Sequence, residues 1–469
     1  MRAYGEAAPV SDTPKTRSTT GGPRALLDGR RPLLGAAFLG GYAWSTFAPG
    51  SFGTALFLGL GAVLFAISVP WSSSFHRAFA LVALAALGAT VLTGRFDLRG
   101  FLDGMPTYFG IVAVLLVLSI AGYPIRAARY EAQIRALVAA LTRRGVGIKA
   151  TSGVLGHVLG AVLDVGAFVL IDVITGRAAP KMRLEALRWA GRAFSFAPLW
   201  TNLNVLTATT IVLTGVAYPH LLAATLPFVL LGLAGTVLAA QRGEGGAADV
   251  PGAPLDRGAA AVLLYPVLLV SAVALVNVLF PRLTLTAAIA VTVAVIVLLI
   301  AALATAMTRQ TSPLRRLADE TRGSLSSSHA EFALFGSAGI LVLSLQSLGV
   351  LAPLGVFLSA LPAALVAPAL MFLMAAGFVA GIHVIPMVLL LDAAFPLDAG
   401  PSPVLWAVAI LLGSQATLLL TPFSSAVTML SRLTGLHPLE AGPKRNWRFG
   451  LAVGVGALIY LGLLTALLL

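Results

Sequence analysis

Apolar runs about as long as a bilayer is thick recur along almost the whole of this 469-residue chain. A helix needs roughly 17–25 such residues to cross the hydrocarbon core. The chain is 58% hydrophobic and only 10% charged, with a mean hydropathy of +0.94. Because hydrocarbon cannot bond backbone N–H and C=O groups, runs of this length must form helices that satisfy those groups internally. The sequence therefore predicts an all-α polytopic membrane protein, embedded in a lipid bilayer.

The charges between the apolar runs predict an orientation. The first spans are expected at residues 33–48, 52–70, 76–94 and 107–124. The loop that follows has one acid, Glu131, against six basic residues: Arg126, Arg129, Arg135, Arg143, Arg144 and Lys149. Because basic loops stay on the cytoplasmic side, we expect a cytoplasmic N-terminus and a bacterial inner-membrane location. The net charge of +13 arises from such loops, so no nucleic-acid partner is predicted.

Two polar segments divide the chain. Residues 1–32 are rich in Gly, Pro, Ser and Thr, which predicts a disordered cytoplasmic tail. A Gly-rich linker at 241–257 separates a first transmembrane repeat, 33–240, from a second, 258–469. Together the repeats are expected to hold about 10–12 transmembrane segments. The chain has no cysteine, and its six histidines show no metal-ligand spacing, so neither a cofactor nor a metal site is predicted.

Two segments suit hairpins that enter the membrane and return. Residues 150–176 could cross once, but that would export the basic loop after them, which holds Arg177, Lys181, Arg183, Arg188 and Arg192. A glycine-rich re-entrant hairpin keeps this loop in the cytoplasm. A second hairpin is expected within 351–397, a proline-rich run too long for one crossing and too short for three. The amphipathic stretch 128–143 suits either an interfacial helix or one packed on protein.

Each half also contains an apolar helix with a short polar break. The first break covers residues 197–204 and the second 421–425, and each leads to a Leu-Thr-Gly sequence. Counted from Pro198 and Pro422 to the glycines, the two spans differ by four residues, about one helical turn. Paired breaks in two halves are a pointer to a transporter's binding site. Alternatively, Pro only kinks the helices and Ser and Thr satisfy their backbones.

The candidate site residues come from the hairpins and the breaks. Ionisable groups are costly in hydrocarbon, which singles out His157 and Asp164 in the first hairpin and His383 in the second. Asp164, near the expected tip, is a candidate for proton exchange or cation binding, or else is satisfied by backbone amides or His157. Asp172 and Asp392 are expected at the interface. The breaks contribute neutral polar groups: Thr201, Asn202, Asn204, Thr421, Ser424 and Ser425.

The order of these segments resembles the ion transporter superfamily, which includes divalent-anion/sodium symporters, citrate carriers and arsenite permeases. The likeness is carried by an amphipathic helix, the hairpin 150–176, a break at Asn202, and the same order around Gly381-Ile382-His383 and 421–425. The Ser-Asn-Thr triplets of the divalent-anion members are absent. Each half has the same order of spans, hairpin, interrupted helix and final span, which two inverted repeats would explain. The resemblance implies elevator-type transport, a homodimer, and a solute and cation bound at the paired breaks.

The function predicted is ion-coupled secondary transport, driven by Na⁺ or H⁺, of a small anionic solute. No enzymatic activity is predicted, because the chain has no Walker loop, His-Glu-x-x-His or Gly-x-Ser-x-Gly sequence. One alternative is a polytopic membrane enzyme or lipid-handling protein, with its essential residues near one membrane face around 97–103 or 392–398. Another is a scaffold, in which neutral replacements of Asp164 and Asn202 leave function intact.

Overall fold

The computed structural model describes residues 23–48, 50–127, 131–176, 179–242, 257–280, 283–308, 311–397 and 402–469. Within these ranges every regular element is a helix, and seven of the helices are long and apolar enough to cross a membrane. Shorter apolar helices lie between them. The predicted all-α polytopic fold is therefore confirmed. Most of the predicted linker at 241–257 lies outside the described residues.

The first four helices lie at the predicted early spans: α1 (Pro23–Phe47), α2 (Ser51–Ser68), α3 (Ser74–Leu92) and α4 (Leu98–Leu118). Of these, α2, α3 and α4 are among the seven that are long and apolar enough to cross a membrane. Helix α1 begins at Pro23 and so includes residues 23–32 of the stretch that we predicted to be a disordered tail, while residues 1–22 lie outside the described residues. Arg31 in this stretch is buried, and its guanidinium donates to Ser68 Oγ and His329 Nε2, both at 2.7 Å. These bonds hold the N-terminal part of α1 against α2 and α15 (His329–Leu348).

The first half continues as a hairpin, an interrupted helix and a long helix. Residues 150–176 do fold back on themselves, with a turn at Asp164-Val165. The elements are α5 (Tyr123–Ala127), α6 (Glu131–Arg143), α7 (Ile148–Leu163), α8 (Gly166–Thr175), α9 (Pro180–Phe194), the 3-10 turn η2 (Ala197–Leu199), α10 (Val205–Thr214) and α11 (Tyr218–Gln241). Helix α6 buries Ile134 and Val138 and packs against α7, α8 and α12, so its apolar face is covered by protein.

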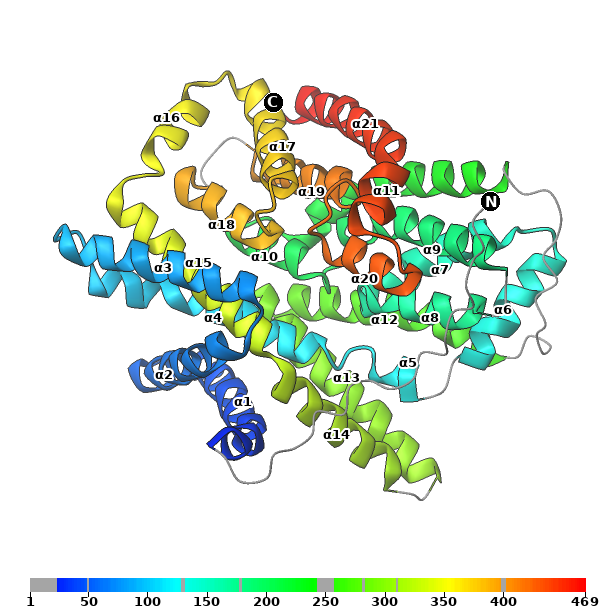
Figure 1. Ribbon diagram of the computed structural model, residues 1–469, viewed down its shortest axis with the longest axis horizontal. Coiled ribbons are helices and arrows are strands. Elements are labelled where there is room, and N and C mark those ends of the chain that lie inside the picture. The colour runs from blue at the N-terminus through cyan, green and yellow to red at the C-terminus, as the bar shows by residue number, and fades with distance from the viewer. Residues whose placement is uncertain are drawn as a thin grey trace, which may run out of the picture.

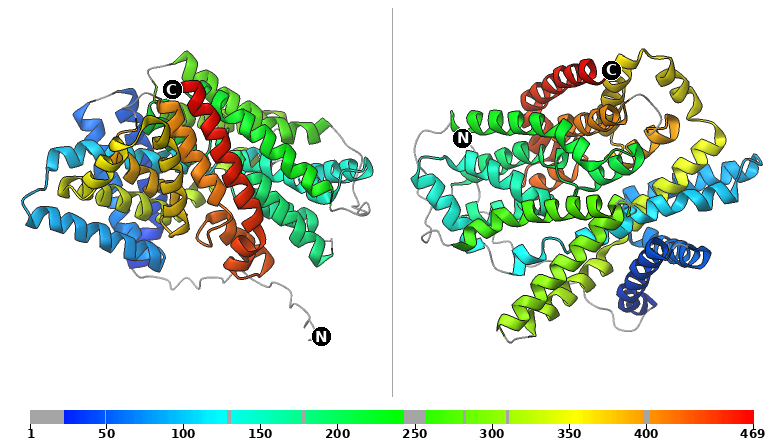
Figure 2. Two further views of the ribbon diagram at one scale, coloured as in Figure 1. Left: turned by 90° about the horizontal axis from the view of Figure 1, so that it is seen from above. Right: turned by 180° about the vertical axis from the view of Figure 1, so that it is seen from behind.

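The second half repeats that order. Its hairpin is α17–α18, its interrupted helix α19–α20, and its long helix α21. The elements are α12 (Arg257–Leu279), α13 (Leu285–Thr308), α14 (Ser312–Ser327), α15, α16 (Ala352–Ala360), α17 (Ala363–Val379), α18 (Val384–Ala394), α19 (Pro403–Thr417), α20 (Ser425–Thr434), the π turn η3 (Glu440–Lys444) and α21 (Arg445–Leu468). In Figures 1 and 2 the dark-blue pair α1–α2 lies at the edge of the molecule, beside α14 and α15.

The two halves pack reciprocally. Within each half, the first hairpin helix lies against the helix before the break, α7 on α9 and α17 on α19. After each break the chain crosses to the other half: α10 packs on α18 and α19, and α20 packs on α8 and α9 (Figure 1). Ala426, Val427 and Leu430 of α20 accordingly belong to the same buried apolar cluster as the first hairpin. Each half thus provides packing partners for the short helix of the other.

Two glycines let these paired helices approach closely. A Cβ at Gly156 of α7 would lie 2.7 Å from the carbonyl oxygen of Ala190 in α9. A Cβ at Gly413 of α19 would lie 2.4 Å from the carbonyl oxygen of Met371 in α17. The obstacle in both places is backbone, which cannot rotate away. The hairpins are therefore held against the interrupted helices by direct backbone contact.

We predict that Gly156→Val and Gly413→Val each destabilise the protein, because the added atoms force packed helices apart. Overpacking of this kind costs about 1–3 kcal/mol. The measurement is the thermal unfolding midpoint of the detergent-purified protein. Gly59→Val in α2 is the matched control, since a Cβ there meets nothing within 4 Å. Midpoints for the two variants equal to that of the control would contradict the close-packing interpretation.

Candidate functional site

The structure shows that the two breaks are built alike. Thr201 Oγ1 accepts a hydrogen bond from Leu203 N at 3.2 Å, and Thr421 Oγ1 accepts one from Phe423 N at 3.3 Å. Three residues further on, a polar side chain caps each short helix. Asn204 Oδ1 accepts from the N–H of Leu206 at 3.0 Å, and Ser424 Oγ accepts from that of Val427 at 3.1 Å. Each break therefore uses a Thr and then a cap to satisfy the freed N–H groups.

The residues of the two breaks do not correspond in the way that the positions of the prolines indicated. Both α10 and α20 have ten residues and end at a left-handed glycine, Gly215 (φ 65°) or Gly435 (φ 69°). In the sequence, the two threonines are 220 residues apart, and so are the two capping residues and the two glycines. Aligning Pro198 with Pro422 was wrong, because Pro198 lies in the 3-10 turn η2, which the second break lacks.

His157 fastens the first hairpin to the first break. Its Nε2 is 3.0 Å from Trp200 Nε1, and its Nδ1 is 3.1 Å from the Ala193 carbonyl oxygen. Because a carbonyl can only accept, Nδ1 carries the proton and Nε2 accepts from the indole. Both ring nitrogens of this buried side chain are thus engaged. Thr201 adds a second link by donating to the Ala161 carbonyl at 3.1 Å.

Two buried amide oxygens at the breaks have no hydrogen-bond partner among the described residues. Asn202 is fully buried; its Nδ2 donates to the Val270 carbonyl at 3.3 Å, but its Oδ1 is unpaired. Gln415, just before the second break, donates to Ser414 Oγ at 3.1 Å and leaves its Oε1 unpaired. An unmade hydrogen bond of a buried group costs about 1–3 kcal/mol. These oxygens are therefore available to a bound ion or ligand.

Asp164 occupies the turn of the first hairpin in a conformation that side chains rarely adopt. Its φ of 50° is the only positive value at a non-glycine among the described residues, and its ψ is −136°. The second hairpin turns with Gly381, whose φ is 93°. Asp164 is exposed and His157 bonds elsewhere, so the predicted alternative of an Asp164–His157 contact is wrong. An acid kept at a strained position that glycine would fill is a candidate for function.

The remaining predicted residues lie at the second hairpin and break. His383 Nδ1 accepts from Ile385 N at 3.4 Å and so caps α18. A Cβ at Gly381 would lie 3.2 Å from the Phe423 ring, so this hairpin tip also touches its own break. Phe423 is 64% exposed, and Ser425 is exposed beside it. Thr421 and Ser424 of the same break are buried, so this break has both buried and exposed polar groups.

The acids predicted at the interface are engaged in structural contacts. Asp172 forms two bonds to the Arg183 guanidinium, at 2.5 and 2.8 Å, and Arg183 also donates to the Leu433 carbonyl of α20. Asp392 Oδ1 accepts from Leu397 N at 3.2 Å. Asp97 caps α4. These hydrogen bonds give Asp172, Asp392 and Asp97 structural roles.

Two features of the fold were not predicted. Arg192, assigned to a cytoplasmic loop, is buried in α9 and donates through Nε to Asn446 Oδ1 at 3.0 Å. The one-turn spacing from Arg188 to Arg192 within an apolar stretch was the available signal. The second feature is a cavity of about 360 Å³ beside α10. Hydroxyl groups line much of it: Tyr42, Ser45, Thr46, Thr107, Thr209, Thr284 and Thr286.

The comparisons with known proteins bear on the fold. No family model matches the sequence, and no curated protein matches it. Among solved structures, the crystal structure of the YdaH transporter of Alcanivorax borkumensis is similar, with a TM-score of 0.51 at 15% sequence identity. The match covers 83% of this chain and 97% of that one. The chain thus has a fold found in a membrane transporter, and its place in the ion transporter superfamily stays a prediction.

We predict that Trp200→Phe destabilises the protein, because it leaves the buried His157 Nε2 without a donor. The expected loss is about 1–3 kcal/mol, measured as a lower unfolding midpoint. Trp44→Phe is the control, because Trp44 is 53% exposed at the end of α1. Equal midpoints for the two variants would show that the indole bond does not fasten the hairpin.

We predict that Asp164→Gly is more stable than Asp164→Ala. Both variants remove the carboxylate, but only glycine removes the Cβ that disfavours this backbone conformation. Strain of this kind is about 1–3 kcal/mol, from which the greater chain entropy of glycine subtracts about 0.5–1 kcal/mol. Thermal unfolding of the two purified variants measures the difference. A less stable glycine variant would argue against a strained turn.

Proposed function

We propose that the protein is an ion-coupled secondary transporter of a small anionic solute, driven by Na⁺ or H⁺, and that solute and ion bind at the paired breaks. The observation that carries the proposal is the match of the two breaks. Each has a Thr, a cap three residues later, and a ten-residue helix ending at a left-handed glycine. Two such devices in corresponding positions are the pattern of transporter binding sites.

The short helices α10 and α20 supply the reason for an anionic solute. Helix N-termini carry a partial positive charge and unpaired N–H groups, which together favour carboxylates and other oxyanions. The caps Asn204 and Ser424 satisfy one N–H group each, which leaves other first-turn groups for a ligand. Ser425 adds an exposed hydroxyl at the start of α20.

The unpaired oxygens supply the reason for a coupling ion. Na⁺ is a hard cation that takes carbonyl oxygens, and Asn202 Oδ1 and Gln415 Oε1 are buried oxygens of that type. Asp164, at the tip of the first hairpin, is the candidate for a titrating or charge-balancing group. Because an exposed carboxylate is costly in lipid, its surroundings are best explained by water that reaches the tip.

The environments of the two short helices support an inverted arrangement. The far end of α10 adjoins the hydroxyl-lined cavity, whose other walls come from α1, α2, α4 and α13 at ends that we predict face outward. The far end of α20 adjoins Arg183, in a loop predicted to be cytoplasmic. Elevator-type movement and a homodimer are further parts of the proposal, drawn from the resemblance. The mass of the protein in detergent or nanodiscs tests the dimer.

The first experiment is a thermal-shift screen of the full-length protein with organic and inorganic anions, with and without Na⁺, at two pH values. A ligand present at a hundred times its dissociation constant stabilises the native state by about 2.7 kcal/mol. We expect a shift that needs an anion together with Na⁺ or a particular pH. Uptake of that anion into proteoliposomes then tests transport. Binding that ignores both ions, with no uptake, would contradict the proposal.

We predict that Asp164→Asn expresses normally but loses ion-coupled uptake. Asparagine has nearly the same shape and tolerates positive φ, so the fold is kept while the charge is removed. Asp103→Asn is the control, since Asp103 is exposed and only 3.9 Å from Arg99 in a surface pair. Full coupled uptake by Asp164→Asn would remove the coupling role of Asp164 and leave the breaks as the site.

A further inference from the structure

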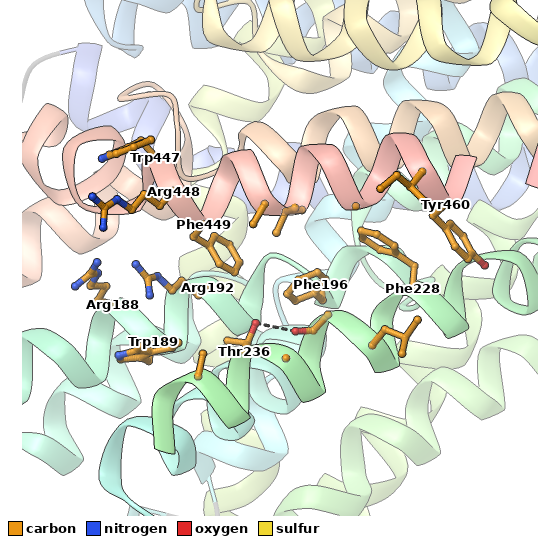
Figure 3. Close-up of a pocket in the computed structure, with 18 of the residues that line it drawn as sticks. Arg188, Trp189, Arg192, Phe196, Phe228, Thr236, Trp447, Arg448, Phe449 and Tyr460 are labelled. Atoms are coloured by element: carbon orange, nitrogen blue, oxygen red, sulfur yellow. Dashed lines mark hydrogen bonds between the residues drawn. The ribbon is translucent and has the colours of Figure 1, made fainter. Parts of the chain in front are cut away.

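A groove of about 940 Å³ lies between α9, α11 and α21, and Phe196, just before the first break, is among its lining residues (Figure 3). Its two ends differ in character. Arginines and tryptophans gather at one end, and Phe228 and Tyr460 lie at the other, with Phe196 and Phe449 between them. The groove is therefore amphipathic along its length.

The basic end carries excess positive charge. Five basic side chains line it: Arg188, Arg192, Lys444, Arg445 and Arg448. Two of them are paired, Arg188 with Glu185 at 3.2 Å and Arg445 with Glu440 at 3.3 Å. For the other three, no carboxylate lies within ion-pair distance among the described residues. This end of the groove therefore suits a ligand that carries an anionic group.

The arginines are held in place rather than free in solution. The Arg192 guanidinium lies 4.5 Å from the Trp189 ring centroid and 5.4 Å from that of Phe449. It also donates to Asn446 Oδ1 and to the Arg445 carbonyl. The Nε groups of Arg188 and Arg445 are buried and have no acceptor among the described residues. The Arg192 guanidinium is thus held in a fixed position at the basic end, and a guanidinium held in this way suits a phosphate.

The rest of the groove is shaped like a channel for a hydrocarbon chain. A Cβ at Gly235 of α11 would meet nothing within 4 Å, so the groove is open there, whereas Phe196 fills the space beside Gly232. From Arg448 to Leu463, α21 rises about 22 Å at 1.5 Å per residue. One leaflet of the hydrocarbon core is about 15 Å thick. The apolar part is thus long enough for one acyl chain.

We propose that this groove binds an anionic phospholipid of the cytoplasmic leaflet. Its phosphate contacts Arg192, Lys444 and Arg448, and one acyl chain runs between α11 and α21. Basic pockets between transmembrane helices on the cytoplasmic side are typical sites for such headgroups, and tryptophans are typical of the interface. The lipid would join the last helix of each half, beside α9, which leads into the first break. This inference is independent of the transported solute.

The test uses the full-length protein, stripped of lipid in detergent. Native mass spectrometry counts bound lipid, and thermal unfolding measures stabilisation by phosphatidylglycerol, cardiolipin, phosphatidylcholine or inorganic phosphate. We expect the two anionic lipids to bind and to raise the midpoint, and phosphatidylcholine and inorganic phosphate to do neither. Equal stabilisation by inorganic phosphate would overturn the proposal in favour of a soluble-anion site. Equal binding of phosphatidylcholine would overturn the role of charge.

Two pairs of variants separate the headgroup from the acyl chain. Lys444→Gln with Arg448→Gln removes two exposed charges and is expected to weaken binding about 30-fold. The control, Arg143→Gln with Arg144→Gln, removes as many exposed charges outside the groove.

Gly235→Leu fills the groove and is expected to abolish the bound lipid. Its control is Gly462→Leu, another exposed glycine with nothing within 4 Å of a Cβ. Variants that match their controls would overturn the proposal.

Discussion

A helix that stops inside a bilayer leaves backbone N–H and C=O groups that lipid cannot bond, and each such group costs several kcal/mol. This chain contains two such stops, and much of its architecture satisfies them. Thr201 and Thr421 accept the first freed N–H groups, and Asn204 and Ser424 accept the next. The hairpins then cover the breaks from the side. In the first half this cover is fixed by the Trp200–His157 and Thr201–Ala161 bonds.

The same need for cover explains the reciprocal packing. A ten-residue helix is too short to bury itself, because most helical stability in proteins comes from packing. Helix α10 finds its partners in α18 and α19, and α20 finds its partners in α8 and α9. Gly156 and Gly413 allow the hairpins to pack closely against α9 and α19, the helices before the breaks. Some buried polar atoms in and beside these helices still lack a partner among the described residues, including the amide oxygens of Asn202 and Gln415 and the hydroxyl groups of Thr209 and Thr210 in α10.

Much of this could be predicted from the sequence, because hydropathy, basic loops and proline breaks are local signals. The hairpin at 150–176 followed from the charges on both sides of it, and the two breaks followed from their polar residues. The register of the breaks could not be predicted from Pro198, since proline marks a stop without fixing the cap. The role of His157 depended on Trp200, 43 residues away, and tertiary contacts of this kind leave no local pattern. The same holds for Arg192, which is buried and bonds to Asn446 in α21, 254 residues away.

The exchange of short helices between the halves also bears on the origin of the chain. The contacts of α10 with α18 and α19 are repeated by α20 with α8 and α9. In a two-fold symmetric dimer, an element i of one subunit contacts element j of the other, and element j of the first contacts element i of the second. The contacts between the two halves have this form. An ancestor of half the length could have made all of them with a second copy of itself. Duplication and fusion would leave the halves free to diverge, and the two turns now differ, with a glycine at 381 and an acid at 164.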